Sequence, residues 1–164
     1  MPAIAADAAL DASLDRAAAL CTRRGAQLTE LRRQVLRLVL ESAQPVGAYA
    51  LLDRLKASRG GAAPPTIYRA LDFLVEQGLI HKVERLGAFI GCTEVEEHPA
   101  DCDCDAGHDH PHQFLICSRC GTTTELSNHG VSLALSRAAA AAGFALARAT
   151  VEAEGICAAC QAAA

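Results

Sequence analysis

Two Cys-x-x-Cys pairs in the last third of the chain are the strongest chemical signal in this sequence. The pairs are Cys117 with Cys120 and Cys157 with Cys160. Each pair can present two thiolates from one tight turn, and two such turns complete the tetrahedral four-sulfur shell of a structural zinc ion. The 36 residues between the pairs exceed the spacing of a usual zinc ribbon, so the ion would join the first and last strands of a small α/β unit. A redox dithiol is the alternative, but it needs a strand–helix–strand setting around one pair, which the sequence does not show.

A second and sparser set of residues could hold another metal ion. Its members are His81, Cys92, Glu125 and either His110 or His112. His81 and Cys92 fall on the two strands of one expected hairpin, which can bring them close together. Nitrogen, sulfur and oxygen ligands in one tetrahedron suit Zn2+. No local spacing marks these residues as ligands, and lone histidines are more often surface or core residues, so spacing alone favours this set less than the four cysteines.

The segment from Thr93 to Pro111 is polar and acidic and fits no regular element. It contains Cys102, Cys104 and His108, which could bind a further metal ion. We favour the simpler interpretation, which is a solvated acidic loop.

The stretch from residue 64 to residue 84 predicts a helix followed by a strand. Two prolines end the preceding segment, Thr66 is the expected cap, and Gly78 ends the helix. Apolar residues line one face of this helix, at Ile67, Leu71, Leu74 and Val75. Tyr68 and Arg69 lie in the first turn, off that face, as in the recognition helix of a winged helix-turn-helix, which enters the major groove by its N-terminal residues. An ordinary amphipathic helix and hairpin is the alternative, and this stretch alone favours DNA binding only slightly.

We expect further helices before the helix of the 64–84 stretch. We expect the strand after that helix to form one half of a hairpin wing. The expected helices are 10–23, 30–41 and 48–56, and the expected wing strands are 79–84 and 88–92. Beyond the acidic loop we expect strands at 112–117 and 122–126, a helix at 131–142 and a strand at 144–154. The fold class is therefore α+β. The expected parts are a winged helix-turn-helix domain (1–84), a wing end and hinge (85–92), and a small metal-binding α/β domain (93–164).

Charge is distributed unevenly along the chain. The net charge is −4, which argues against a nonspecific polycation. Residues 1–84 carry 11 Lys or Arg and 9 Asp or Glu, for a net +2, and the rest carries 4 and 10, for a net −6. A mildly basic half fits phosphate contact, and an acidic half fits metal binding or assembly. Solvated helix faces are the alternative explanation for the arginines of the first half.

Several classes of protein are disfavoured. No run of 18 apolar residues predicts a membrane span, and the N-terminus lacks the basic start of a secretory signal. Eight cysteines without such a signal favour metal binding over disulfides. We therefore expect a cytoplasmic protein with no membrane partner. No Ser-His-Asp set, phosphate-binding glycine loop or paired carboxylates have a clear catalytic setting, so we do not expect an enzyme.

Four motifs together resemble those of the ferric-uptake-regulator (Fur) family, and most closely its zinc-uptake-regulator branch. They run in the family's order and span about residues 20–160. The motifs are Pro-Pro-Thr-Ile-Tyr-Arg-Ala-Leu-Asp-Phe-Leu (64–74), Gly-Leu-Ile-His-Lys-Val-Glu (78–84), Phe-Leu-Ile-Cys-Ser-Arg-Cys-Gly (114–121) and Gly-Ile-Cys-Ala-Ala-Cys (155–160).

The resemblance implies a homodimer, formed through the C-terminal domain, that binds a palindromic operator in double-stranded DNA when loaded with metal and represses metal-uptake genes. It implies that the four cysteines hold a structural zinc ion. It also implies that His81, Cys92 and Glu125 belong to the sensing site of the zinc branch, with one structural and one sensing Zn2+ per chain. The extended loop before Pro111 leaves the fourth sensing ligand between His110 and His112, and we choose His110. Whether one or two dimers occupy each operator is left open.

Candidate DNA contacts follow from the winged-helix reading. Arg69 and Tyr68 are expected to reach base edges, Arg69 at guanine and Tyr68 at a thymine methyl group or a phosphate. Tyr49, Arg32 and Lys82 are expected to contact phosphates. Relatives often have Thr-Pro-Gln-Arg where this chain has Thr-Glu-Leu-Arg at 29–32, and a glutamate in a first helical turn suits the helix dipole.

Two other functions compete with zinc-dependent repression. A relative that senses iron, manganese or peroxide is the nearest, but a thiolate ligand favours zinc over those harder ions. A zinc-storage or zinc-chaperone protein could use the Cys/His/Asp loop, but it would leave the helix with Tyr68 and Arg69 unexplained.

Overall fold

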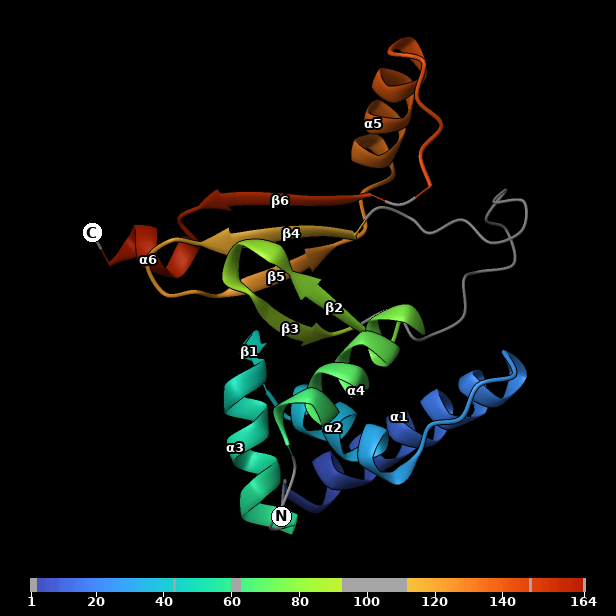
Figure 1. Ribbon diagram of the computed structural model, residues 1–164. Coiled ribbons are helices and arrows are strands. Elements are labelled where there is room, and N and C mark those ends of the chain that lie inside the picture. Colours follow the sequence, from blue (N-terminus) through green and yellow to red (C-terminus); the bar gives the residue numbers. More distant parts are fainter. Residues whose placement is uncertain (1–2, 43, 60–62, 93–111, 148, 164) are drawn as a thin grey trace. The chain divides into compact units, whose positions relative to one another are not determined.

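The computed structural model describes residues 3–42, 44–59, 63–92, 112–147 and 149–163. The chain divides into two compact units, unit 1 (Met1–Glu97) and unit 2 (His98–Ala164), and each is considered by itself. Figure 1 shows their elements as ribbons. The expected acidic loop, which carries Cys102, Cys104, His108 and His110, lies outside the described residues, as does the expected domain start at residue 93.

Within its described residues, unit 1 consists of helices and one small sheet. The helices are α1 (Ala3–Arg23), α2 (Glu30–Leu40), α3 (Ala48–Arg59) and α4 (Pro64–Glu76). The strands are β1 (Val46–Gly47), β2 (Ile80–Val83) and β3 (Ala88–Gly91), and the 3-10 turn η1 (Glu84–Leu86) joins the last two. They form an antiparallel sheet in the order β1-β3-β2. Packed helices followed by a β2–β3 wing make unit 1 a winged helix-turn-helix, as the sequence predicts.

Helix α4 begins before Thr66. Its N-cap is Ala63, and two prolines occupy its first positions, where a missing N–H costs nothing and the fixed φ suits the helix. The expectation that Thr66 caps the helix is therefore wrong. The chain leaves the helix through Gly78, whose φ of +66° a glycine adopts without strain. The buried face of α4 joins one core with the other three helices. It consists of Ile67, Ala70, Leu71 and Leu74.

A row of aspartates on α1 faces two arginines on α2. Asp15 pairs with Arg33 at 2.6 Å, and Asp11 pairs with Arg37. Asp7 lies 3.9 Å from the same Arg37 guanidinium. The aspartates recur every four residues, so they share one helix face. Exposed pairs of this kind stabilise by only about 0.2–1 kcal/mol each, so their larger effect is to occupy the two guanidinium groups.

Unit 2 contains a three-stranded sheet with β4 at its centre. The strands are β4 (His112–Cys117), β5 (Thr123–Leu126) and β6 (Thr150–Gly155), and the helices are α5 (His129–Ala141) and α6 (Ala158–Ala162). Strand β4 pairs antiparallel with β5 and parallel with β6. The sheet order is therefore β5-β4-β6, and unit 2 is a small α/β unit.

The last strand is shorter than the sequence predicts. The alternating pattern from Phe144 to Glu154 suggests one strand, but only the part from Thr150 onward pairs with β4. Phe144 and Leu146 are 71 % and 46 % exposed. Their alternation is real, but residues 144–147 and 149 form no strand in the structure, so the expected strand is wrong at these positions.

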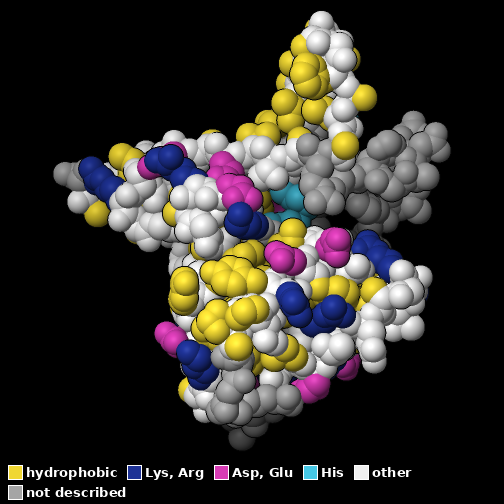
Figure 2. Space-filling model, viewed as in Figure 1, with side chains coloured by type: hydrophobic (Ala, Val, Ile, Leu, Met, Phe, Trp, Pro, Cys, Tyr) yellow, Lys and Arg dark blue, Asp and Glu magenta, His cyan; other side chains and the backbone are white. Residues whose placement is uncertain are grey.

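Helix α5 has no buried side chain. Val131 and Leu133 are each 39 % exposed, and the exposed Phe144 follows close behind the helix. Figure 2 shows hydrophobic side chains over the surface of this part of unit 2. An exposed apolar surface of this kind is typical of a protein–protein contact. Among the described residues, no helix has the length and apolar character needed to cross a bilayer.

Candidate metal centre and nucleic-acid interface

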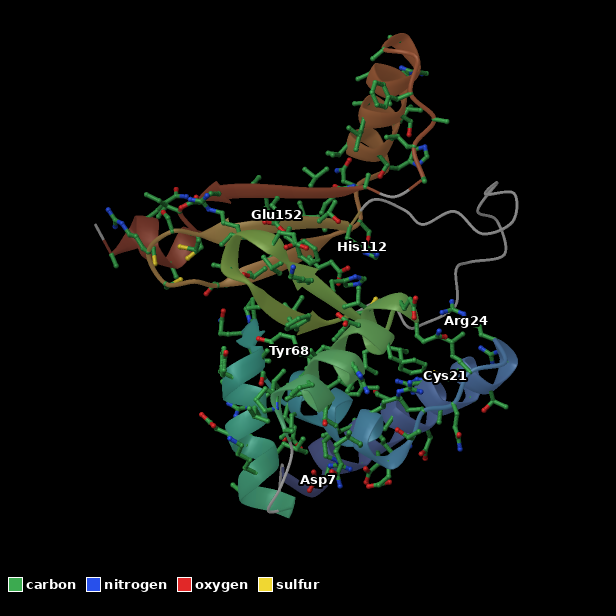
Figure 3. All side chains as sticks on the ribbon, viewed as in Figure 1. Asp7, Cys21, Arg24, Tyr68, His112 and Glu152 are labelled. Atoms are coloured by element: carbon green, nitrogen blue, oxygen red, sulfur yellow. The ribbon has the colours of Figure 1, made fainter. Side chains whose placement is uncertain are left out.

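Four sulfur atoms come together at one end of the unit 2 sheet. The Sγ atoms of Cys117, Cys120, Cys157 and Cys160 lie within 4.8 Å of one another, and those of Cys120 and Cys157 are 3.7 Å apart. A tetrahedral zinc site with Zn–S bonds of about 2.3 Å places its sulfurs about 3.8 Å apart. All four thiols are free, and their spacing fits that shell. In Figure 3 sulfur atoms gather beside α6.

The two Cys-x-x-Cys turns are held together by the sheet. Strand β4 ends at Cys117, and the turn after it reverses at Gly121 (φ +73°), whose N–H donates to the Cys117 carbonyl at 2.9 Å. The parallel register pairs Cys117 with Gly155 at the end of β6. Cys157 then begins α6 as its N-cap, and its N–H donates to the Cys117 sulfur at 3.3 Å. Cysteines far apart in sequence therefore meet because β4 and β6 are neighbours.

The pKa values of these thiols are spread apart. The N–H of Cys157 is the main cause that lowers the pKa of Cys117 to about 6. The hydroxyl of Thr122 is the main cause that lowers the pKa of Cys120. Hydrogen bonding to Cys120 and then to Cys157 raises the pKa of Cys160 to about 12. A bound cation would favour the thiolate form of all four sulfurs, including that of Cys160.

The second expected metal set has residues in both units, and unit 2 brings two of them together. His112 Nδ1 lies 3.4 Å from Glu125 Oε1. Glu125 pairs with Phe114 across β4 and β5, and His112 precedes Phe114 by two residues, so both side chains share one sheet face. Nitrogen and oxygen ligands of one tetrahedral zinc ion lie about 3.4 Å apart. His110, our choice from the sequence, lies outside the described residues.

Unit 1 supplies the other two expected ligands from its wing. The β2–β3 register pairs His81 with Ile90, and the N–H of Cys92 donates to the Leu79 carbonyl at 3.2 Å. Cys92 follows Ile90 by two residues, so it lies diagonal to His81 on the same face of the hairpin. The hairpin therefore aligns His81 and Cys92 as the sequence suggests, while their role as ligands stays a prediction.

Two aromatic side chains and one arginine are exposed near the start of two helices. Tyr68 and Arg69 lie in the first turns of α4, and both are exposed, Tyr68 by 41 %. Tyr49 lies in the first turn of α3 and is 70 % exposed. Figure 3 labels Tyr68 on α4. Because α4 occupies the recognition-helix position of a winged helix-turn-helix, its exposed Tyr68 and Arg69 are the candidates for reading the bases of a duplex.

Arg32 and Lys82, two of the expected phosphate contacts, are engaged inside unit 1. The Arg32 guanidinium carbon lies 3.5 Å from the centroid of the Phe73 ring, and its Nη1 donates to the Gln27 carbonyl at 2.7 Å. Lys82 Nζ lies 2.5 Å from Glu84 Oε2. Arg32 is therefore also a packing residue, held by a cation–π contact. Contact of either side chain with DNA stays a prediction.

Residues 23–154 match the sequence profile described as the Ferric uptake regulator family, which covers most of the chain. The chain belongs to the ferric uptake regulator family. Its winged-helix unit and its cysteine cluster both fall within the matched region, apart from α1 at the start and the second cysteine pair at the end.

Relatives of this family member include proteins named for zinc. The Zinc uptake regulation protein of Escherichia coli (strain K12) is 40 % identical over 147 residues, which cover 90 % of this chain and 80 % of that protein. A zinc uptake regulator solved in complex with zinc and DNA matches with a TM-score of 0.82 and 38 % identity, over 94 % of this chain and 96 % of that one. The crystal structure of holo XcZur matches with a TM-score of 0.75 and 40 % identity, over 91 % and 96 %.

Sequence reasoning missed two residues that support the cysteine cluster of this Fur-family chain. Thr122 Oγ1 lies 3.1 Å from the Cys120 sulfur, and Arg119 Nη1 donates to the Cys160 carbonyl at 2.9 Å. Arg119 lies between the cysteines of the first pair, so its position was visible in the motif. Its partner was not, because the contact depends on α6 folding back against the turn. Thr122 carried no signal beyond being two residues from Cys120.

Proposed function

We propose that this chain is a zinc-responsive transcriptional regulator, whose zinc-loaded homodimer binds operator DNA and represses zinc-uptake genes. The observation that carries the proposal is the match, over nearly the whole chain, to a zinc uptake regulator solved with zinc and DNA. The exposed Tyr68 and Arg69 of α4 supply a reading surface, and the thiolate and imidazole ligand sets supply zinc chemistry. A regulator of this kind works by binding, so it is not expected to be an enzyme, and its free thiols suit the reducing cytoplasm.

Each chain would hold two zinc ions in different roles. The structural ion takes the four cysteine sulfurs, a closed shell that leaves no position for another ligand. The sensing ion takes His81 and Cys92 from the wing, Glu125 from β5 and one histidine near the start of β4. The 3.4 Å separation between His112 and Glu125 supports His112, and His110 is the competing assignment from the sequence.

Sensing would act through the geometry of the dimer. A zinc ion held by wing residues and by unit 2 residues would tie the two units together through metal–ligand bonds. It thereby fixes the angle between the two α4 helices of the dimer, and only one angle fits half-sites about one helical turn apart. Zinc and DNA then strengthen each other's binding reciprocally, and a coupling of about 3 kcal/mol corresponds to roughly 150-fold tighter DNA binding.

Unit 2 offers the surface for a second copy of the chain. Helix α5 has no buried side chain, and exposed apolar residues follow it at Phe144 and Leu146. A two-fold dimer buries the same patch on both copies, which suits an unpartnered helix. Two-fold symmetry also matches a palindromic operator. Binding of two dimers to one operator is an additional arrangement.

The test is operator binding over a series of buffered free-zinc concentrations. Operator fragments are first selected from a random duplex library with zinc-loaded protein, and gel shifts are then run with the metal content measured on the same samples. We expect binding to strengthen roughly 150-fold as the sensing ion loads, while the structural ion is already present. Equal binding at all zinc levels would contradict the proposal.

The same assay separates the competing functions. An iron- or manganese-sensing relative would respond to Fe2+ or Mn2+ at lower free concentration than to Zn2+, although the Cys92 thiolate favours zinc. A peroxide sensor would lose binding after peroxide treatment. A zinc-storage or zinc-chaperone protein would bind zinc without selecting any duplex sequence.

Substitution of Arg69 by alanine tests the reading surface. If Arg69 reads a base edge, we expect the variant to lose about 1–3 kcal/mol of operator affinity while its affinity for random duplex changes little. Lys56→Ala, which removes one exposed positive charge from α3, is the matched control and should leave the ratio of the two affinities unchanged. An equal loss on operator and random DNA would instead make Arg69 a phosphate contact.

A further inference from the structure

Gln113 joins the central strand of unit 2 to the first turn of α5. Its Nε2 donates to the Asn128 carbonyl at 2.9 Å and to the Ser132 hydroxyl at 3.0 Å. The amide orientation is determined by chemistry, because the Asn128 carbonyl can only accept and the nitrogen must therefore face it. Gln113 is 3 % exposed, and its Oε1 has no hydrogen-bond partner among the described residues.

These two bonds matter because few other contacts hold α5 within the part of unit 2 that the structure describes. None of its side chains is buried, so among the described residues of one chain apolar packing does not define its direction. Figure 1 shows α5 extending away from the strands of its own unit. The orientation of α5 is therefore set at its first turn, where Gln113 binds the N-cap residue Asn128 and Ser132 one turn later.

Gln113 also lies beside the candidate sensing ligands. It follows His112 on β4, and across the sheet it pairs with Leu126, which follows Glu125 on β5. Successive strand residues point to opposite faces. The candidate ligands and the Gln113 side chain thus lie on opposite faces of the sheet, at the same ends of β4 and β5. A movement of these strand ends would therefore change the positions of both the ligands and the Gln113 amide.

We propose that Gln113 is a positioning residue, through which zinc at the sensing site sets the orientation of α5 and so the geometry of the dimer. This inference rests on the proposed function, because it assigns a path to the zinc response of that same site. Gln113 is neither one of the proposed metal ligands nor one of the proposed DNA contacts; it acts by fixing the helix that carries the apolar surface offered to a second copy.

The structure allows this role to be separated from simple folding. Without the Gln113 amide, the Asn128 carbonyl still accepts from the Ser132 N–H at 3.2 Å and from the Ser132 hydroxyl at 3.3 Å. Gln113→Leu therefore leaves no newly unpaired carbonyl, and it also removes a buried oxygen without a partner, which is unfavourable in itself. We expect unit 2 to fold and to retain its structural zinc in this variant.

The experiment measures two quantities on the full-length dimer with and without sensing zinc: operator affinity and amide hydrogen exchange of α5. In the wild type, zinc should tighten operator binding and slow exchange in α5. In Gln113→Leu, we expect the zinc-induced gain in affinity to fall by roughly 2- to 30-fold, and zinc no longer to slow exchange in α5. A variant that keeps the wild-type gain and the wild-type exchange response overturns the inference.

Two further variants complete the design. Gln161→Leu removes another amide of unit 2, which donates to the Ile156 carbonyl at 2.5 Å beside the cysteine cluster, and it should keep the full zinc response. If Gln113→Leu loses its structural zinc, Ser132→Ala decides, since it removes one of the two acceptors; a zinc response at the wild-type level in that variant overturns the inference. A wild type that does not respond to zinc would instead refute the proposed function, so the two failures are distinguishable.

Discussion

Cys92→Ser should abolish the zinc response while leaving a folded dimer. The substitution replaces the only thiolate of the proposed sensing set by a hydroxyl, which is a poor zinc ligand. We expect operator affinity at saturating zinc to fall roughly 150-fold, to the level of the protein without sensing zinc. Metal analysis should find one zinc ion per chain instead of two, and circular dichroism should be unchanged.

Cys21→Ala is the matched control for this experiment. Cys21 is fully buried in the core of unit 1, and this burial raises the pKa of its thiol, so it is an inert apolar group. Its removal should leave the zinc response intact. If Cys92→Ser binds the operator as the wild type does over the whole zinc series, the sensing assignment is wrong. His110→Ala and His112→Ala in the same assay identify the fourth ligand, since only one should reproduce the Cys92→Ser result.

Cys160→Ser should have the largest effect on stability. With one of four sulfurs removed, the closed zinc shell of unit 2 cannot form, and structural zinc contributes about 10–16 kcal/mol of apparent binding free energy in small zinc domains. We expect loss of the bound ion and unfolding of unit 2, measured by metal analysis and by hydrogen exchange of β4 and β6. Ser118→Ala, which removes only a hydroxyl bond to the Gly155 carbonyl at 3.1 Å, should retain zinc.

The same site predicts how acid releases the structural ion. Zinc displaces thiol protons, and the raised pKa of Cys160, about 12, means that this thiol is protonated at neutral pH before zinc binds. Zinc binding therefore releases protons, and zinc affinity must fall as the pH is lowered. Zinc retention that is independent of pH, or a stable unit 2 without zinc in Cys160→Ser, would contradict a four-sulfur structural site.

The elements that the sequence predicts well are those with a strong period or a clear stop. Helix α4 shows an apolar face and a terminal glycine, and the spacing of the four cysteines predicts the cluster that their sulfurs form. The predictions were wrong where one local sequence pattern is compatible with two structures. Pro64 and Pro65 end one segment but also begin α4. The alternation starts at Phe144, but among the described residues strand pairing starts only at Thr150.

The proposed sensing set gives a weaker signal in the sequence, because its residues share no local spacing. His81 and Cys92 are aligned by hairpin register, and His112 meets Glu125 through the pairing of β4 with β5. Register depends on strand pairing across the sheet, so single-residue patterns do not reveal it. The internal partners of Arg32 were invisible for the same reason, because the ring of Phe73 belongs to another helix.

The aspartates of α1 change how unit 1 should interact with a polyanion. Arg33 and Arg37 already have carboxylate neighbours, so aspartates of α1 act as counter-ions for these two arginines of α2. A guanidinium group that is paired with a carboxylate is less available to contact a DNA phosphate and release the cation condensed there. Such phosphate contacts give a DNA affinity that depends on salt concentration but not on base sequence. We therefore expect weaker binding to arbitrary DNA, with a larger share of the binding free energy left to the proposed recognition helix α4.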